Sequence, residues 1–328
     1  MFHCPRSLAM LACVSHRSLQ NARTRKVLYA ALCAALLTVV SPNNARAQQL
    51  EPRLYANAPT GLNFLLAGYQ YSWGDVFTDP SLPIENANAK VNALVFGYSR
   101  VLDFWGQSGT LAALLPYAWI SANGQLEGQS RSVTRSGFGD LGLRLAVNLL
   151  GAPALSLEEF REYRQDTIVG VSLALTAPTG QYDNTKLVNV GTNRWSFKPE
   201  LGVSKALGRW ILEGAASVTF YTDNDEVLGN NVRHQDPLYA LQVHAVYNFN
   251  PKLWGALDGT YYFGGRTSVN GTLNEDLQSN TRWGATLAQS LDIHNSIKLY
   301  FSSGLVARTG TNFTTVGIAW QYRWGAGL

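Results

Sequence analysis

The sequence predicts an all-β protein: a closed antiparallel transmembrane β-barrel of about twelve strands, preceded by an export signal. Between residues 62 and 324, apolar and polar residues alternate with a period of two in recurrent long segments. A tilted strand crosses a membrane in about 9–11 residues, whereas strands of soluble sandwiches usually have about 5–6 residues. Connections that alternate between long and short, and aromatic residues at the segment ends, are also typical of outer-membrane barrels.

Residues 1–47 have the composition of a cleavable signal peptide. They contain six basic residues and no acidic residue, and an apolar run extends from Val27 to Val40. This run is too short to span a bilayer as a helix, which takes about 20 residues. Ala45-Arg46-Ala47 forms a small-x-small cleavage pattern. We therefore expect cleavage after Ala47 and a barrel built from residues 48–328, with translation beginning at Met1 or at Met10.

The chain beyond Ala47 has a slight excess of acidic residues and no cysteine. The whole sequence has 26 lysines and arginines, 22 acidic residues and three cysteines, and residues 1–47 hold six of the basic residues and every cysteine (Cys4, Cys13 and Cys33). The mature chain therefore has neither a disulfide nor a thiolate metal site. Its basic residues do not cluster among aromatic residues, which argues against nucleic acid as a partner. We expect no cofactor and no metal ion.

The period-two alternation is clearest between Asp140 and Leu149, where leucines face one way and Asp140, Arg144 and Asn148 face the other. Twelve segments follow the pattern, and bacterial barrels have an even number of strands. The predicted strands are residues 62–74, 89–101, 110–121, 137–149, 167–178, 194–205, 209–222, 238–249, 252–264, 281–292, 296–307 and 312–324.

The connections between these segments predict the orientation in the membrane. The short ones are residues 206–208, 250–251 and 293–295. Because short turns of outer-membrane barrels face the periplasm, we expect both termini on the periplasmic side of the bacterial outer membrane. Residues 150–166 depart from the pattern, since they are long where a short turn is expected, and Leu157–Tyr163 suits a short helix.

Closure of the sheet follows from the solvent that surrounds it. Backbone N–H and C=O groups in hydrocarbon must all be hydrogen-bonded, so a sheet that spans a membrane has no open edge. Aromatic residues near the strand ends fit the two interfacial girdles, and packing in a soluble sandwich core is the alternative. These residues are Tyr71, Trp73, Trp195, Phe197, Tyr247, Phe249, Tyr322 and Trp324.

Two motifs resemble a known family. Pro178-Thr179-Gly180-Gln181-Tyr182-Asp183, followed by Asn189-x-Gly191-x-Asn193-Arg194-Trp195-Ser196-Phe197-x-Pro199-x-Leu201-Gly202, closely resembles the outer-membrane proteins named for the meta-pathway of phenol degradation. Gly137-Phe138-Gly139-Asp140-Leu141 is similar to the glycine–aspartate element of that family. The resemblance covers nearly all of residues 48–328 and implies an outer-membrane transporter of small aromatic or otherwise hydrophobic compounds. The family name does not itself establish a substrate.

The C-terminus departs from this resemblance. Barrels of this kind commonly end on an aromatic residue that the barrel-assembly machinery recognises, whereas Trp324 is followed here by Gly325-Ala326-Gly327-Leu328. The departure concerns the assembly signal and leaves the predicted fold unchanged. During biogenesis we still expect the assembly machinery as a partner.

Charged residues on the faces assigned to the lumen are candidates for lining a pore. On the lipid face, an arginine or lysine at mid-depth costs about 2–4 kcal/mol. Two readings of these residues stay open: they set the ion preference of a pore, or they pair across a narrow lumen and fill it. Twelve strands lie between the filled eight-stranded and the open sixteen-stranded barrels, so a narrow pore is expected. The candidates are Lys90, Asp140, Arg144, Arg194, Lys198, Glu200, Glu213, His244, Asp258, Arg282, Lys298 and Arg323.

The loop from Gly180 to Asn193 is a candidate constriction, because it is too long for a tight turn and holds the family-like motif. It either folds inward to narrow the pore or forms a stable extracellular turn shaped by its glycines and Pro178. The constriction candidates are Tyr182, Asp183, Asn184, Lys186, Asn189 and Asn193.

These features predict a passive channel for small solutes, with outer-membrane lipid and a small-molecule solute as partners. The sequence assigns neither the solute nor an oligomeric state. The first alternative is a plugged barrel with a structural or partner-binding role. The second is a membrane-embedded lipid hydrolase that uses His244 with Ser204 or Ser217; no nucleophile-elbow motif supports it, so we expect no enzyme. A soluble lectin-like sandwich is a third.

Overall fold

The computed structural model describes residues 51–77, 84–126 and 129–328. The predicted signal peptide and its cleavage site after Ala47 lie outside these residues, and so does part of the loop predicted between Gly74 and Asn88. Among the described residues, no helix is long and apolar enough to span a membrane, a finding that does not bear on spanning strands.

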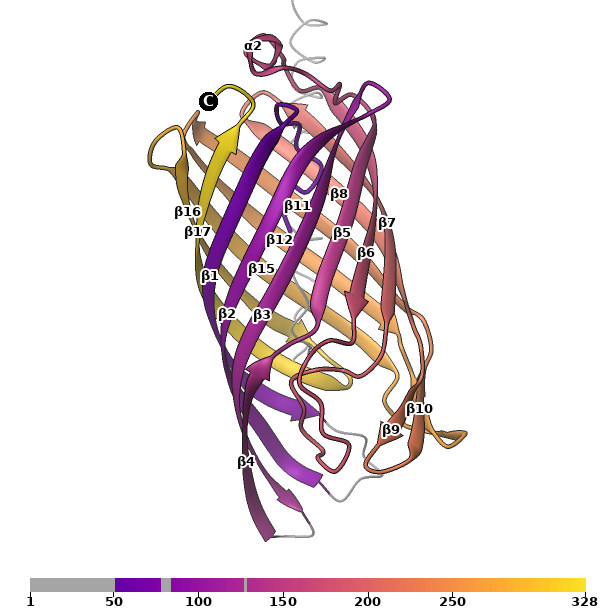
Figure 1. The fold of residues 1–328 in the computed structure, drawn as a ribbon. Helices are drawn as coiled ribbons and strands as arrows, with labels where there is room; N and C mark the ends of the chain where they lie inside the picture. The colour runs from indigo at the N-terminus through magenta and orange to yellow at the C-terminus, as the bar shows by residue number, and fades with distance from the viewer. Residues whose placement is uncertain (1–50, 78–83, 127–128) are drawn as a thin grey trace, which may run out of the picture. The chain divides into compact units, whose positions relative to one another are not determined.

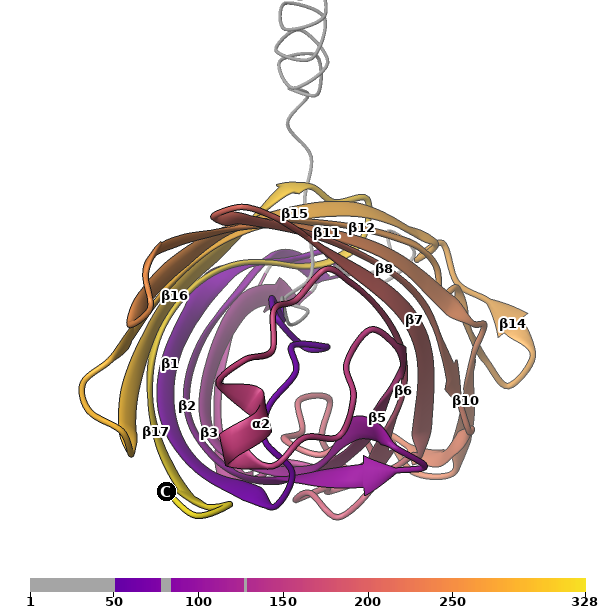
Figure 2. The same ribbon diagram turned by 90° about the horizontal axis from the view of Figure 1, so that it is seen from above.

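Twelve antiparallel strands close into a barrel (Figures 1 and 2), as predicted. Closure is made by the first and last strands, which pair along their whole length from Leu62↔Gly325 to Phe77↔Gly310. All other neighbours in the wall are consecutive in the chain apart from short insertions. The wall strands are β1 (Leu62–Phe77), β2 (Ile84–Phe104), β3 (Gln107–Leu126), β5 (Leu141–Leu150), β6 (Thr167–Ala177), β7 (Ser196–Leu207), β8 (Trp210–Tyr221), β11 (Leu238–Asn250), β12 (Leu253–Gly264), β15 (Gln278–Ser290), β16 (Asn295–Val306) and β17 (Gly310–Gly325).

Each wall strand turns one face to the lumen and the other to the outside, because successive side chains of a strand point to opposite sides. In β11, Gln242, His244 and Val246 are buried. The residues that alternate with them face outward, and Leu241 and Val243 are 52% and 63% exposed. Leucine, valine and aromatic side chains dominate the exposed face of the other wall strands as well. An apolar outer face around a more polar interior suits a barrel surrounded by lipid.

The predicted strand 137–149 is divided in two. A further strand, β4 (Gln129–Phe138), ends before Gly139 and Asp140, and β5 begins after them. β3 pairs with β5 through Gly109–Leu114 and with β4 through Tyr117–Leu126, so Pro116 lies at the change of partner. Proline has no N–H to donate to a ladder, which explains the interruption at this point. Sequence patterning missed β4 because its residues are almost all polar.

The two ends of the barrel differ in their connections (Figure 1). The end with the C-terminus, here called the short-turn end, also carries the helix α2 (Leu157–Phe160). Ser156 and Glu159 form a capping box at its start, and the predicted short helix is confirmed. The opposite, long-loop end carries a small separate sheet that patterning did not predict, since its strands are too short to show a period. These strands are β9 (Asn224–Val227), β10 (Asn231–Gln235), β13 (Thr267–Val269) and β14 (Thr272–Leu273).

Aromatic side chains lie on the outer face near both ends of the barrel. Trp73 and Trp195 are exposed towards the long-loop end, and Trp324 is exposed at the short-turn end. Neighbouring rings stack in pairs, as Trp195 does with Phe197 at a centroid distance of 6.4 Å and Tyr322 with Trp324 at 5.8 Å. Their positions are those expected of interfacial girdles.

Candidate functional site in the barrel lumen

Residues 51–61, which directly precede β1, run inside the barrel. Figure 2 shows this segment, in indigo, inside the ring of strands together with α2 and the connection that carries it. The segment and the connection are joined by two hydrogen bonds: the backbone N–H of Thr60 donates to Leu155 O (2.8 Å), and Asn57 Nδ2 donates to Pro153 O (3.1 Å). We call residues 51–61 the lumenal segment. Sequence patterning did not identify it, because it shows neither alternation nor a motif.

Tyr55 inserts its ring between the lumenal segment and the wall. The side chain is 6% exposed and lies against Gly170 of β6 and Gly202 of β7, which are directly paired in the ladder. A Cβ added at Gly170 would lie 2.2 Å from Tyr55 Cδ1, and one added at Gly202 would lie 2.1 Å from Tyr55 Cε2. Any other residue at either position would therefore exclude the ring. The Tyr55 hydroxyl donates to Glu200 Oε1 (3.2 Å) and lies 3.5 Å from Ser172 Oγ.

Charged contacts hold the rest of the lumenal segment. Glu51 forms an ion pair with Arg144 of β5. The backbone N–H of Arg53 donates to Glu213 Oε2 of β8 (2.7 Å), and the Arg53 guanidinium lies 5.3 Å from the centre of the Trp254 ring, in cation–π contact. These contacts reach three different wall strands, so the segment is fixed across the lumen.

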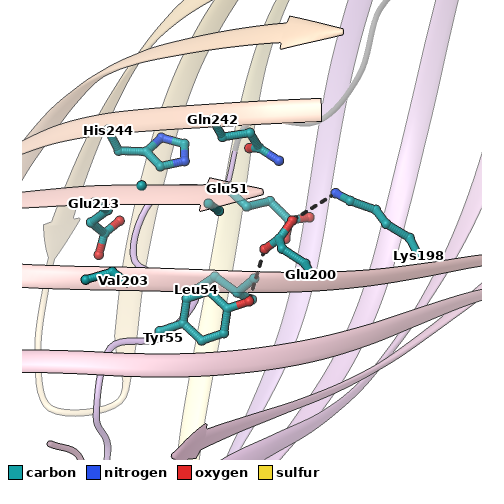
Figure 3. Close-up of a pocket in the computed structure, with 11 residues that line it drawn as sticks. Glu51, Leu54, Tyr55, Lys198, Glu200, Val203, Glu213, Gln242 and His244 are labelled. Carbon is teal, nitrogen blue, oxygen red and sulfur yellow. Dashed lines mark hydrogen bonds and ion pairs between the residues drawn. The ribbon is translucent and has the colours of Figure 1, made fainter. Parts of the chain in front are cut away.

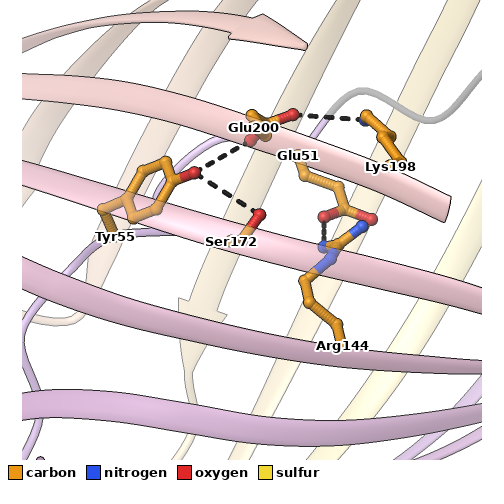
Figure 4. A network of polar contacts seen from close by, with 6 residues as sticks. All are labelled: Glu51, Tyr55, Arg144, Ser172, Lys198 and Glu200. Carbon is orange, nitrogen blue, oxygen red and sulfur yellow. Dashed lines mark hydrogen bonds and ion pairs between the residues drawn. The ribbon is translucent and has the colours of Figure 1, made fainter. Parts of the chain in front are cut away.

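The lumenal side chains around the segment form a compact polar cluster (Figures 3 and 4). Lys198 Nζ lies 3.2 Å from Glu200 Oε2, on the side of the carboxylate away from Tyr55. Glu51, Tyr55, Lys198 and Glu200 are among the residues that line a cavity of about 20 Å³. A water molecule needs about 10–15 Å³ of such space. This cavity therefore has room for about one water molecule.

His244 and Asp258 form a buried pair on facing positions of β11 and β12. His244 Nδ1 lies 2.6 Å from Asp258 Oδ1, and both side chains are at most 5% exposed. Beside them, Glu213 Oε1 accepts a hydrogen bond from Ser204 Oγ (3.0 Å). Neither Ser204 nor Ser217 is hydrogen-bonded to His244 in the described part of the chain. The arrangement that a serine hydrolase requires is therefore not formed.

Eight of the predicted pore-lining residues face the lumen. Arg282 of β15 is 1% exposed and lies along the inner face of the wall, where Nη1 donates to Phe313 O (2.9 Å) and Nη2 to Ser302 Oγ (2.7 Å). Lys298 of β16 lies 6.0 Å from the centre of the Tyr300 ring. The eight are Arg144, Lys198, Glu200, Glu213, His244, Asp258, Arg282 and Lys298.

Three other candidates lie at the ends of the barrel. Asp140 does not line the lumen: its carboxylate accepts hydrogen bonds from Gly180 N (2.9 Å), Thr192 N (2.8 Å) and Thr192 Oγ1 (2.6 Å). It faces a loop because it lies in the break between β4 and β5. Arg194 stacks over the Tyr221 ring (4.4 Å) at the long-loop end. Arg323 donates from Nε to Ile293 O (2.6 Å) in a turn at the short-turn end.

The prediction for Lys90 is wrong. Lys90 shares one face of β2 with Phe96 and Tyr98, which are 49% and 43% exposed on the outside of the barrel. It pairs with Trp73 near the long-loop end, where a lysine can extend towards water. Alternation is ambiguous in β2 because both of its faces carry apolar residues.

The loop from Gly180 to Asn193 is docked at the long-loop end. Tyr182 donates to Glu226 O (3.2 Å), and Asn193 Nδ2 donates to Asn224 Oδ1 (3.0 Å), so the loop lies on the β9–β10 hairpin. Asn189 Nδ2 closes the loop on Asp183 O and Lys186 O (both 3.0 Å), and Asn184 Nδ2 contacts Gly229 O (3.5 Å). Hydrogen bonds from Thr185 lower the pKa of Asp183. The segment that enters the lumen is residues 51–61, and constriction by this loop stays a prediction.

The inner wall formed by β1, β2 and β3 is mostly apolar, with Gln70, Ser72 and Ser99 as polar exceptions, and sequence patterning did not identify it. A Cβ added at Gly97 would lie 2.6 Å from Leu114 Cδ2 and 3.4 Å from Leu66 Cβ, so these three positions share the inner face. Leu66, Val95 and Leu114 are partly exposed although they face inward, so they border open lumen. The available signal was the loss of alternation within 110–120, where both faces are apolar. The inner residues are Phe64, Leu66, Val91, Ala93, Val95, Ala112, Leu114, Pro116, Ala118 and Ile120.

No group of three or more potential metal-ligating side chains occurs among the residues that the structure describes. His234 contacts Asp223 (2.7 Å) and lies 3.7 Å from Asp236, all three being about half exposed on the loops.

Residues 74–324 match the model of the family described as "Putative MetA-pathway of phenol degradation". The chain belongs to this family. The crystal structure of an outer-membrane channel from Pseudomonas putida F1 is similar, with a TM-score of 0.72 and 22% identity over 84% of this chain and 100% of that chain. The β domain of the Bordetella autotransporter BrkA matches with a TM-score of 0.49 and 12% identity, over 81% of this chain and 100% of that one. The toluene transporter TodX of Pseudomonas putida matches with a TM-score of 0.45 and 10% identity, over 87% of this chain and 95% of that chain. No curated protein sequence matches the chain.

Proposed function

We propose that this protein is an outer-membrane channel for passive uptake of small apolar or aromatic solutes, closed at rest by its lumenal segment. The observation that carries the proposal is the division of the lumen. One inner wall, on β1–β3, is mostly apolar and borders open space, and the facing wall on β5–β12 carries the paired charges. A solute with an apolar body and one polar group fits between two such walls.

The same geometry supports a working cycle. Tyr55 and Glu51 belong to a segment that is covalently continuous with β1, while their partners Glu200 and Arg144 belong to the wall. Displacing residues 51–58 leaves every strand of the barrel intact, since none of the wall ladders includes them. The segment can therefore open the lumen without unfolding the barrel. The short-turn end, where the segment enters, is in this proposal the periplasmic end, with both termini on that side.

A plugged barrel with a structural role is the second candidate, favoured by the cavity of only about 20 Å³ at the polar cluster. Single-channel conductance in planar bilayers separates the two. The refolded mature chain is compared with a variant that lacks residues 51–58. Rare openings of the full mature chain and frequent openings of the variant are expected. A folded, inserted variant that stays silent would refute the channel and leave the structural barrel.

A further inference from the structure

Tyr55 presents a phenol group to a site that is shaped for it. We call Gly170, Ser172, Glu200 and Gly202 the tyrosine slot. Figure 4 shows the Tyr55 ring beside the strands that carry Ser172 and Glu200, β6 and β7, with its hydroxyl directed at these two side chains. The ring is bound as a ligand would be, because it comes from a segment outside the wall and makes no part of any strand.

The floor of the slot requires two glycines at paired positions. Gly170 and Gly202 lie opposite each other on β6 and β7, and both face the lumen. Glycine inside a strand weakens it and commonly marks close approach of another group. Here the group is a flat six-membered ring, whose carbon atoms occupy the positions that two Cβ atoms would take. A planar aromatic solute matches this floor.

The polar end of the slot selects a hydroxyl group. The Glu200 side chain is 6% exposed, with Lys198 on one carboxylate oxygen and the Tyr55 hydroxyl on the other. Without a donor at the second position, a buried carboxylate oxygen would lose its hydrogen bond, which is unfavourable. A phenol hydroxyl supplies this donor. Toluene has no donor, and benzoate would place a second negative charge against Glu200.

We propose that the tyrosine slot is a binding site for small phenolic solutes, which Tyr55 occupies as a tethered stand-in while the channel is closed. A free phenol that enters the slot takes the place of the Tyr55 ring and so favours release of the lumenal segment. The inference rests on the proposed channel function, and it adds the chemical class of the solute and the means by which the solute opens its own path.

Competition with Tyr55 sets the expected affinities. The apparent affinity for a free ligand is reduced by the fraction of molecules in which its site is vacant. If the ring is docked in about nine tenths or more of the molecules, the vacant fraction is about one tenth or less. Tyr55→Ala should then bind phenol at least about tenfold more tightly than the unchanged chain. Tyr55→Ala should also bind phenol at least about tenfold more tightly than toluene, because a site built around a hydroxyl rejects analogues without one.

The test is isothermal titration of phenol, toluene and benzoate into the refolded mature chain and its variants, with empty detergent as the blank. Tyr55→Ala vacates the slot, and Tyr55→Ala/Gly202→Ala fills the vacated floor with a methyl group. Tyr300→Ala is the matched control. It also removes a lumenal tyrosine that covers a glycine, Gly317, but the Tyr300 hydroxyl donates to the neutral amide oxygen of Gln70 (3.1 Å). Each variant is shown to be folded if its barrel resists unfolding by denaturing detergent in unheated samples, as seen by gel mobility.

The expected result is saturable binding of one phenol to Tyr55→Ala that is lost in Tyr55→Ala/Gly202→Ala and is no tighter in Tyr300→Ala than in the unchanged chain. No saturable binding to folded Tyr55→Ala, or equal binding to Tyr55→Ala and the double variant, would overturn the inference. Binding to Tyr300→Ala with equal affinity would overturn it as well. Conductance of the variant without residues 51–58 is measured in parallel. If this variant conducts but binds no phenol, the tyrosine slot is refuted and the channel function stands. If it is folded and silent, the channel function is refuted.

Discussion

A single methyl group on the wall of the barrel is expected to release the lumenal segment. Gly202→Ala adds a Cβ that would lie 2.1 Å from the Tyr55 ring, where ordinary contact begins near 3.4 Å. The Cβ is fixed to the β7 backbone, so the ring has to leave. Truncation of a well-packed buried aromatic side chain costs about 3–5 kcal/mol. If displacement of the ring costs a similar free energy, the docking equilibrium constant of the segment falls by between about a hundredfold and a few thousandfold, because 1.4 kcal/mol is about tenfold.

Gly214→Ala is the matched control for this prediction. It adds the same methyl group on the outer face of the neighbouring strand β8, away from the lumenal segment, where the nearest atom, Gln242 O, would lie 3.9 Å away. The assay is the open probability of single channels in planar bilayers, with Tyr55→Ala and the Tyr55→Ala/Gly202→Ala double variant alongside. Gly202→Ala should raise the open probability. In the Tyr55→Ala background it should cause no further rise, because the ring that it displaces is already absent. An open probability equal to that of the control would refute the docking of Tyr55 as the closing contact.

Three further predictions concern parts of the chain outside the slot. Asp140→Ala removes the acceptor of three hydrogen bonds from the loop 180–193, which together contribute about 2–4 kcal/mol. Trypsin should therefore cleave this loop at least tenfold faster in limited proteolysis. An unchanged cleavage rate would refute the anchoring role of Asp140. His244→Ala leaves a buried carboxylate without its partner and should lower the free energy of unfolding in urea by about 3 kcal/mol; lipid hydrolysis that disappears in this variant would instead support an enzyme. The pKa of Asp183 lies below its ordinary value of 3.8, so its turn should keep its form as the pH falls to about 4 and lose it only below the lowered pKa. An NMR titration of the loop amides checks this, with Asp183→Asn as the pH-independent control.

Patterning predicts the barrel well because a membrane strand is defined by local properties. Length, a period of two and the position of turns are all set within about a dozen residues. The predicted strands 238–249 and 252–264 match β11 and β12 to within one residue. The prediction failed where the local pattern is weak, as in β4, which is polar on both faces, and in β2, where apolar residues on both faces left the orientation of Lys90 ambiguous.

The candidate site was predictable only in part. Alternation assigns Lys198 and Glu200 to one face of β7, and the structure places both in the lumen. It does not say which of them pair, nor that Asp140 faces a loop. The lumenal segment left no periodic signal, because it belongs to no sheet and its side chains contact several strands at once.

The sequence by itself determined the family, the number of spanning strands and the alternation of their faces, and it predicts an export signal that stays an expectation. Only the tertiary structure decided what fills the barrel. Tyr55 meets Ser172 and Glu200 across sequence separations of 117 and 145 residues. The paired glycines become a slot only once β6 and β7 lie side by side in register. Such contacts arise from closure of the sheet, which brings residues distant in the chain to the same depth of one lumen, and no local pattern records them.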